Sequence, residues 1–206
     1  MPDGIGLNTR FKDRQNTKYE RKSDMIREES KTDRIYVREA VPEDAARLLE
    51  IYAYYVESTA ITFDYEVPTL EEFEARIGRI KERYPYLVII RDGVIEGYAY
   101  AGVFKDRAAY DRSCEMTIYL DRNAKGSGLG RKLYTELEEA LKAQGILNLY
   151  ACIGVPEEPD EYLDFNSEQF HAHLGYTTVG TFHKCGYKFG RWYNMIWMEK
   201  MIGEHT

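Results

Sequence analysis

The chain has 206 residues and a formal net charge of −7, with 28 Lys and Arg residues against 35 Asp and Glu residues. Hydrophobic residues make up 44%, which is enough for one compact domain with its own core. The acidic balance argues against nucleic acid as the main partner. No apolar stretch is long enough to span a bilayer and the N-terminus is polar, so we expect neither a membrane partner nor a secretory signal.

The first 33 residues mix basic and acidic side chains and contain few large apolar ones. This composition predicts a polar, flexible extension at residues 1–33. From residue 34 the pattern becomes regular, and we expect one domain over residues 34–200 followed by a short tail, 201–206.

Alternating apolar and polar residues over 34–39 predict the first strand. Pro42, followed by acidic residues, is typical of a helix start. Thr69 and Glu72 have the spacing of a capping box, which predicts the start of a second helix.

The dipeptide Asp92-Gly93 separates two β-prone runs and predicts a hairpin. Leucines recur every four residues from Leu129 to Leu141, which predicts a helix that ends at Gly145. The remaining predicted elements are strands at 114–120 and 147–153, a short helix at 167–174, and a strand pair at 176–184 and 187–200. The order β-α-α-β-β-β-α-β-α-β-β indicates an α/β domain with a mixed, mostly antiparallel sheet flanked by helices.

Residues 125–131, KGSGLGR, form a glycine-rich turn between a predicted strand and a predicted helix. Such a turn exposes backbone N–H groups at a helix N-terminus, which suits a phosphate or pyrophosphate. A Walker A loop is excluded because Arg131 stands where its second glycine is required, and the G-x-G-x-G spacing differs from the dinucleotide fingerprint. What remains is a basic residue, Lys125, followed by Gly128 and Gly130.

This pattern resembles the pyrophosphate loop R/Q-x-x-G-x-G/A of the GNAT acyltransferases, although Lys replaces the usual Arg or Gln and loses the planar fork. The element order is also that of the GNAT fold. Four segments, 60–65, 97–102, 105–111 and 171–176, further resemble the phosphinothricin acetyltransferase subfamily. That subfamily transfers acetyl from acetyl-CoA to the α-amine of phosphinothricin, methionine sulfone or methionine sulfoximine.

The resemblance implies acetyl-CoA as co-substrate, with its pantetheine arm bound by backbone groups of the strand before the glycine loop. It also implies that the sheet opens there, often with the help of a β-bulge. For Ile118 and Leu120, core packing is a second, compatible role. The implied co-substrate residues are Ile118, Tyr119, Leu120, Lys125, Gly126, Ser127, Gly128, Leu129, Gly130, Arg131 and Asn166.

Glu115 lies in a predicted interior strand, where a carboxylate is costly unless it has a partner or a task. The resemblance implies that Glu115 is the general base, with a pKa raised by apolar surroundings. The alternative is a structural carboxylate paired with an Arg or Tyr. His171 resembles the second catalytic or substrate-contacting residue of the subfamily. His173 lies two residues further on and does not share its helix face, so we expect no metal site.

The resemblance places the acceptor substrate against Lys105, Arg107 and Tyr110, where two cations and a hydroxyl suit a carboxylate and a phosphinyl or sulfonyl group. An ordinary solvated loop is the alternative. Phe63 and Tyr65 are expected to wall the same pocket.

The segment before the last short helix departs from the family. The family often has N-x-x-S there, and Asp164 occupies the Asn position while Ser167 occupies the Ser position. Asn166 is a substitute if the loop shifts. The preceding stretch, 156–161, is also longer and more acidic than expected, so the contact to pantetheine is open between Asp164 and Asn166.

Three readings of function follow. The favoured one is an N-acetyltransferase for a small amino-acid-like amine. The others are a GNAT enzyme for a polyamine, an aminoglycoside or a protein N-terminus, and a non-catalytic acyl-CoA binding module. Lys105 and Arg107 would repel cationic acceptors, and the presence of Glu115 and His171 favours catalysis.

The resemblance also implies a homodimer, with residues 186–193 near the interface. Cys114, Cys152 and Cys185 are odd in number and far apart, without a C-x-x-C pair, so neither a disulfide framework nor a zinc site is indicated. We therefore expect a cytoplasmic protein.

Overall fold

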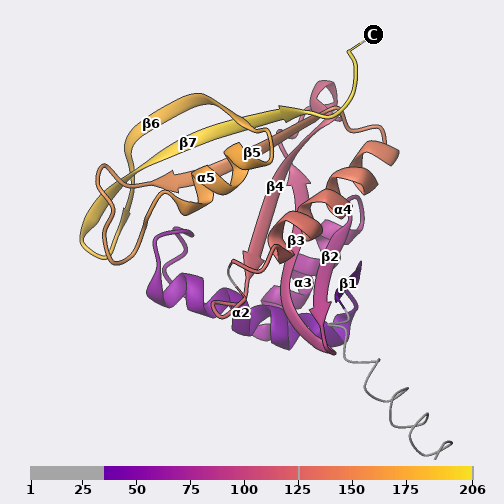
Figure 1. Ribbon diagram of the computed structural model, residues 1–206, viewed down its shortest axis with the longest axis horizontal. Coiled ribbons are helices and arrows are strands. Elements are labelled where there is room, and N and C mark those ends of the chain that lie inside the picture. The colour runs from indigo at the N-terminus through magenta and orange to yellow at the C-terminus, as the bar shows by residue number, and fades with distance from the viewer. Residues whose placement is uncertain (1–34, 125, 206) are drawn as a thin grey trace, which may run out of the picture. The chain divides into compact units, whose positions relative to one another are not determined.

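The computed structural model describes residues 35–124 and 126–205, and the expectations for residues 1–33 and for Lys125 lie outside the described residues. The described chain forms a seven-stranded sheet in the order β1-β2-β3-β4-β5-β7-β6 (Figure 1). Neighbouring strands are antiparallel in the β2–β3, β3–β4, β5–β7 and β6–β7 pairs and parallel in the β4–β5 pair. The strands are β1 Ile35–Glu39, β2 Tyr86–Arg91, β3 Val94–Val103, β4 Ser113–Leu120, β5 Asn148–Val155, β6 Thr177–Lys188 and β7 Arg191–Met201.

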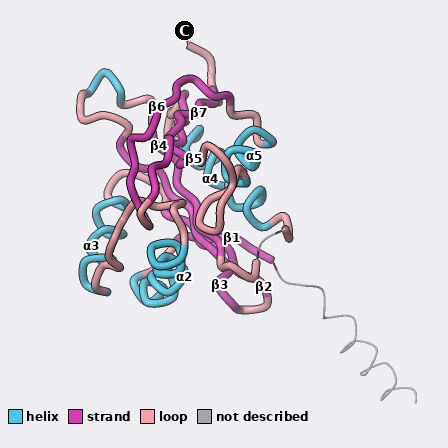
Figure 2. Tube along the Cα trace, turned by 90° about the vertical axis from the view of Figure 1, so that its left-hand side faces the viewer, coloured by secondary structure: helices cyan, strands magenta, loops and turns pink. Residues whose placement is uncertain are grey.

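Helices cover both faces of the sheet. Helices α2 and α3 lie on one side, and α4 and α5 lie on the other (Figure 2). Their bounds are α2 Ala45–Ser58, α3 Leu70–Lys81, α4 Leu129–Ala143 and α5 Asn166–His173, with short 3₁₀ turns at Pro42–Asp44 and Ala108–Tyr110. The predicted α/β class and element order are confirmed. No helix in the described ranges is long and apolar enough to cross a membrane.

The predicted capping box and hairpin turn are both present in the structure. The N–H of Glu72 donates to the Thr69 hydroxyl at 3.2 Å, and the N–H of Thr69 donates to the Glu72 carboxylate at 2.8 Å, which completes the capping box of α3. Asp92 and Gly93 have φ values of 52° and 84°, as a tight hairpin turn requires.

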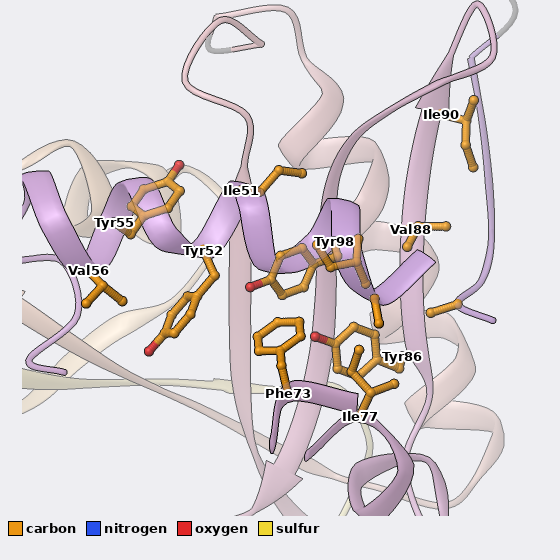
Figure 3. Close-up of a cluster of buried hydrophobic side chains, with 13 residues drawn as sticks. Ile51, Tyr52, Tyr55, Val56, Phe73, Ile77, Tyr86, Val88, Ile90 and Tyr98 are labelled. Carbon is orange, nitrogen blue, oxygen red and sulfur yellow. The ribbon is translucent and has the colours of Figure 1, made fainter. Parts of the chain in front are cut away.

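The core beneath α2 and α3 is rich in tyrosine. Figure 3 shows Tyr52, Phe73, Tyr86 and Tyr98 meeting in this layer. Tyr86 and Tyr98 stack with ring centroids 5.6 Å apart, and both are 1% exposed. On the opposite face, the leucine stripe of α4 is fully buried, which explains its four-residue period.

The final strand pair differs from its prediction. The sequence predicts a break after residue 184, whereas β6 continues to Lys188 and turns at Phe189 and Gly190, whose φ values are 52° and 74°. The strand accommodates this with a register shift between Phe182 and Gly186. Gly186 is therefore not a turn residue. A Cβ built on it would stand 2.4 Å from the Phe63 ring, so glycine is required there for close packing.

The contact between β3 and β4 generates a stability prediction. A Cβ at Gly97 would lie 2.7 Å from the Tyr119 carbonyl oxygen, which belongs to the backbone and cannot rotate away. Gly97→Ala should therefore destabilise the fold by about 1–3 kcal/mol in urea unfolding. Gly102→Ala, on the same strand with nothing within 4 Å of its Cβ position, is the matched control and should leave stability nearly unchanged. Equal effects of the two variants would contradict this account.

Candidate active site

The sheet opens between β4 and β5. The two strands pair in parallel over three residues, and the last pair joins Glu115 to Tyr150. Beyond it, residues 116–120 of β4 have no partner on the β5 side. The register between β3 and β4 is continuous through Leu120, so the opening forms without the expected β-bulge in β4.

The free edge of β4 presents peptide groups to this opening. The N–H of Asp121 donates to the Glu96 carbonyl on β3 at 2.7 Å. Peptide groups alternate in direction along a strand, so those of Ile118 and Leu120 face away from β3 and into the opening. The backbone of Tyr119 faces β3 instead, and its side chain forms part of a cavity wall. The Tyr55 hydroxyl donates to the Leu120 carbonyl at 2.6 Å.

Three adjoining cavities follow the opening. The inner cavity, about 460 Å³, is lined by Glu115 and His171 among others, and the loop cavity, about 360 Å³, is lined by the glycine loop. A neck of about 100 Å³ lies between them. The neck shares Ile61, Ile118 and Ser167 with the inner cavity and shares Leu120, Asn166 and Phe170 with the loop cavity. The shared walls make one passage from the glycine loop to Glu115.

The glycine loop has the backbone that its sequence predicts. Gly126 and Gly128 have φ values of 77° and 76°, and Gly128 is the N-cap of α4. A Cβ at Gly130 would lie 3.2 Å from both Leu120 Cδ1 and Phe170 Cε2, so glycine lets the helix start close to the neck. The free N–H groups and the positive end of α4 therefore meet at the loop cavity, an arrangement suited to a pyrophosphate. Of the predicted loop residues, Gly126, Ser127, Gly128, Leu129, Gly130 and Arg131 all line this cavity.

Glu115 stands at the point where β4 and β5 separate and lines the inner cavity. Burial raises the pKa of its carboxyl, and the charge of Lys105 partly opposes this increase. Among the described residues, no Arg or Tyr pairs with it, so the structural alternative finds no partner. A half-buried carboxylate with a raised pKa that faces a cavity can accept a proton.

His171 is 3% exposed and is held from both sides. Its Nδ1 lies 2.7 Å from the Ser167 carbonyl oxygen, which only accepts, so Nδ1 carries the proton. In the neutral imidazole Nε2 is then an acceptor, and the Tyr134 hydroxyl, 3.0 Å away, donates to it. Burial lowers the pKa of His171, which favours this neutral form.

Tyr134 is the site residue that the sequence analysis missed. It lies on α4 next to Leu133, is 0% exposed to solvent, and lines the inner cavity. On the sequence it is one more apolar residue of an amphipathic helix. Only the packing of α4 against α5 places its hydroxyl on His171, so no local signal distinguishes it from the core.

Comparison with known proteins now decides the family. A family model described as an acetyltransferase (GNAT) domain matches residues 37–197. The chain belongs to the GNAT acetyltransferases. It is 37% identical to a phosphinothricin N-acetyltransferase of Streptomyces viridochromogenes, over 78% of this chain and 84% of the relative. It is 32% identical to the L-methionine sulfoximine/L-methionine sulfone acetyltransferase of Salmonella typhimurium, over 82% and 96% of the two chains.

The fold of this GNAT acetyltransferase agrees with solved structures. A phosphinothricin acetyltransferase from Sinorhizobium meliloti, crystallised with AcCoA, superposes with a TM-score of 0.76 at 33% identity, covering 84% of this chain and 90% of that one. A ribosomal-protein-alanine N-acetyltransferase from Brucella melitensis gives a TM-score of 0.74 at 31% identity, covering 81% and 99%.

The predicted acceptor residues do not all meet in the inner cavity. Phe63 lines it, whereas Tyr65 is 69% exposed and its hydroxyl donates to the Tyr187 carbonyl. Lys105, Arg107 and Tyr110 lie in the connection between β3 and β4, and none of the three lines the inner cavity.

Lys105 nevertheless acts on the site at a distance. Its ammonium lies 5.1 Å from the ring centroid of Phe104 and 5.7 Å from that of Trp197, and its charge lowers the pKa of Glu115. These two aromatic faces hold the cation within range of an electrostatic effect on Glu115, without a direct contact between the two side chains.

Asp164 and Asn166 differ in their position relative to the neck. Asp164 accepts a hydrogen bond from the N–H of Asn166 at 2.9 Å, so its carboxylate is used at the start of α5. Asn166 itself lines both the neck and the loop cavity, whereas Asp164 lines neither. Asn166 is thus the side chain available to a ligand in the passage.

The electrostatic contact to Glu115 can be measured directly. Lys105→Met removes the charge that opposes the burial effect, so the pKa of Glu115 should rise further. The measurement is an NMR titration of the carboxyl carbon of Glu115. Lys132→Met is the control, because Lys132 is an exposed residue of α4 that pairs with Glu136 at 3.6 Å. A Glu115 pKa that is the same in the Lys105→Met variant and the parent would refute the coupling.

Proposed function

We propose that this protein is an acetyl-CoA-dependent N-acetyltransferase for the α-amine of a small amino-acid-like acceptor, of the phosphinothricin, methionine sulfone or methionine sulfoximine type. The observation that carries the proposal is the passage from the glycine loop to Glu115. It has a phosphate-binding end, a strand edge with free peptide groups and a cavity that holds a general-base candidate. The named activities of the similar proteins support the acceptor class.

Acetyl-CoA suits each part of the passage. The glycine loop at Gly126–Arg131, together with Lys125, would hold the pyrophosphate. The peptide groups of Ile118 and Leu120 and the amide of Asn166 would bind the pantetheine amides through the neck, beside the side chain of Tyr119. The thioester would then reach the inner cavity. The described residues contain no cluster of His, Cys, Asp or Glu suited to a metal ion, and this proposal requires none.

The reaction removes two protons from nitrogen and adds one to sulfur. Glu115 takes one proton from the acceptor ammonium, and the free amine nitrogen attacks the thioester carbonyl. A new C–N bond forms, the C=O bond becomes a C–O⁻ bond, and the adduct nitrogen still carries one proton too many. The Tyr134 oxygen takes that proton while its own hydrogen moves to Nε2 of His171. In the reverse transfer the Tyr134 hydroxyl protonates sulfur and recovers its hydrogen from Nε2 of His171. At the same time the C–O⁻ bond becomes C=O again and the C–S bond breaks, which releases N-acetyl product and CoA thiol.

The side of the inner cavity formed by Phe63, with Lys105 nearby, suits a small acceptor that carries an anionic group. The aromatic ring of Phe63 limits the inner cavity opposite β4, and Lys105 supplies a nearby positive charge. We propose that Tyr65, Arg107 and Tyr110 also contact the acceptor, once it or a second subunit brings them to the cavity. The positive charges of Lys105 and Arg107 would repel cationic acceptors such as polyamines and aminoglycosides.

A thiol-release assay with acetyl-CoA tests the acceptor class. The panel contains phosphinothricin, methionine sulfone, methionine sulfoximine, spermidine, an aminoglycoside and a peptide with N-terminal alanine. We expect turnover on the first three. Turnover only on the polycations or the peptide would overturn the acceptor assignment, and no turnover on any of them would favour an acyl-CoA binding module.

A single substitution tests whether Glu115 is the general base. Glu115→Gln keeps the size of the side chain and removes the proton acceptor, so kcat should fall by about 10²–10⁴-fold. Acetyl-CoA binding, measured by calorimetry, should be unchanged because the loop cavity and neck are intact. Activity equal to the parent would show that another group accepts the proton.

We further propose that the GNAT domain extends over residues 34–200, with 1–33 as an N-terminal extension and 201–206 as a tail, and that the protein acts as a cytoplasmic homodimer. Free thiols at all three cysteines agree with a reducing compartment. Phe182, Tyr187 and Trp192 are 52%, 47% and 58% exposed on β6 and β7, an apolar surface suited to a second copy. Light scattering at micromolar concentration should give twice the chain mass, and a monomer would contradict this proposal.

A further inference from the structure

The acceptor side of the inner cavity is formed by a loop. Residues 59–65, called the acceptor loop below, follow α2 and have no regular secondary structure. Ile61, Thr62 and Phe63 of this loop line the inner cavity. A wall without regular structure keeps its shape only if other elements hold it, because its backbone hydrogen bonds are not supplied by a helix or sheet.

Lys188, at the end of β6, binds the backbone of this loop. Its side chain is buried, with 3% of the residue exposed, and its Nζ donates to the Thr59 carbonyl at 2.9 Å and to the Thr62 carbonyl at 2.8 Å. Thr59 is the C-cap of α2, so one of these carbonyls is a helix-end acceptor that needs a donor.

A buried ammonium that binds two neutral carbonyls is an expensive arrangement. Lys188 forms no ion pair with any described residue, and burial lowers the pKa of its amine, while the charge of Asp64 acts in the opposite direction. Methionine at this position would fill similar space without the desolvation cost. The ammonium also lies 5.1 Å from the ring centroid of Phe189, which stabilises the charge but needs no hydrogen bond. The two hydrogen bonds of Lys188 both go to the acceptor loop, so the charge is best explained by the loop that it organises.

The two residues before Lys188 contact the same loop. A Cβ at Gly186 would stand 2.4 Å from the Phe63 ring, and the backbone carbonyl of Tyr187 accepts the hydroxyl of Tyr65. A Cβ at Gly154 would lie 3.4 Å from the same ring. The Phe63 ring thus packs closely against two glycines, and three consecutive residues of β6, 186–188, contact the acceptor loop.

We propose that Lys188 is a positioning residue for acceptor binding: it fixes the acceptor loop through Thr59 and Thr62 and thereby sets the place of Phe63 in the inner cavity. The kinetic part of this inference rests on the function proposed above, and the structural part does not. Lys188 itself lines neither the loop cavity nor the neck, and of the acceptor loop only Ile61 reaches the neck, so the effect of Lys188 should fall mainly on the acceptor.

Hydrogen exchange tests the structural part without any activity. In Lys188→Met the amides of residues 60–64 should exchange about tenfold faster or more, because two hydrogen bonds from a charged donor are lost. The amides of residues 126–131 should be unchanged. Lys184→Met is the control, since Lys184 lies on the same strand but pairs with the exposed Glu157 at 3.3 Å. Unchanged exchange at residues 60–64 in Lys188→Met would overturn the proposal.

Kinetics test the functional part on the acceptor that the panel identifies. Lys188→Met should raise the acceptor KM about tenfold and leave the acetyl-CoA KM within about twofold of the parent, whereas Lys188→Arg, which keeps donors, should recover part of the loss. An equal rise in both KM values would indicate general damage and refute a positioning role. If Lys188→Met does not fold, Lys188→Gln replaces it. The same measurements then apply: the acceptor KM and the acetyl-CoA KM relative to the parent, and hydrogen exchange at residues 60–64.

These experiments distinguish a failure of the proposed function from a failure of the role proposed for Lys188. If the parent protein acetylates no acceptor in the panel, the proposed function fails while hydrogen exchange still decides whether Lys188 holds the loop. If the parent is active and the exchange at residues 60–64 is unaltered in the variant, the function stands and the role of Lys188 is wrong.

Discussion

The three-residue parallel pairing between β4 and β5 is the constraint on which the site depends. Pairing holds the strands together up to Glu115 and Tyr150, and its end leaves the peptide edge of Ile118 and Leu120 without a strand partner on that side. A longer ladder would satisfy these groups and close the passage, while a shorter one would lose the rigid position of Glu115. The same feature therefore opens the space proposed for the pantetheine arm and places Glu115, the proposed base, at the end of that space. On the other side, the pairing of β3 with β4 is continuous, so the opening costs no distortion of the sheet.

Burial shifts the pKa values of Glu115 and His171, which both line the inner cavity, in opposite directions. Burial raises the pKa of Glu115 and lowers that of His171, because it disfavours the charged form of each. Burial therefore favours the protonated carboxyl of Glu115 and the neutral imidazole of His171. In the proposed reaction these two groups are the proton acceptors, Glu115 directly and His171 through the Tyr134 hydroxyl. Acetylation of an ammonium removes two protons from nitrogen, which matches a site with two acceptors.

The sequence predicts most of the fold and about half of the site, and the division follows how local each signal is. The glycine turn before α4, the capping box at Thr69 and the Asp92-Gly93 turn depend on residues a few positions apart, so the local structures predicted for them are confirmed. Tyr134 and Lys188 depend on contacts across 37 and 129 positions of the chain. On the sequence they read as a core aromatic and an ordinary strand lysine. The predicted position of the last turn was wrong for the same reason. Gly186 is a glycine because it packs against the ring of Phe63, which is distant in the sequence, and not because its backbone turns there.

The two halves of the passage consequently have different architectures. The co-substrate half is built mainly from one continuous segment, 118–131, in which a strand edge, a glycine turn and a helix start follow one another. The acceptor half is assembled from the acceptor loop, from Gly154 and from residues 186–188, which only the tertiary fold brings together. A change in any of these pieces can reshape the acceptor wall without touching the strand edge or the helix N-terminus. Such a construction allows the acceptor to vary while the acyl donor stays the same, because the two binding surfaces share little more than the wall at Ile61, Ile118 and Ser167.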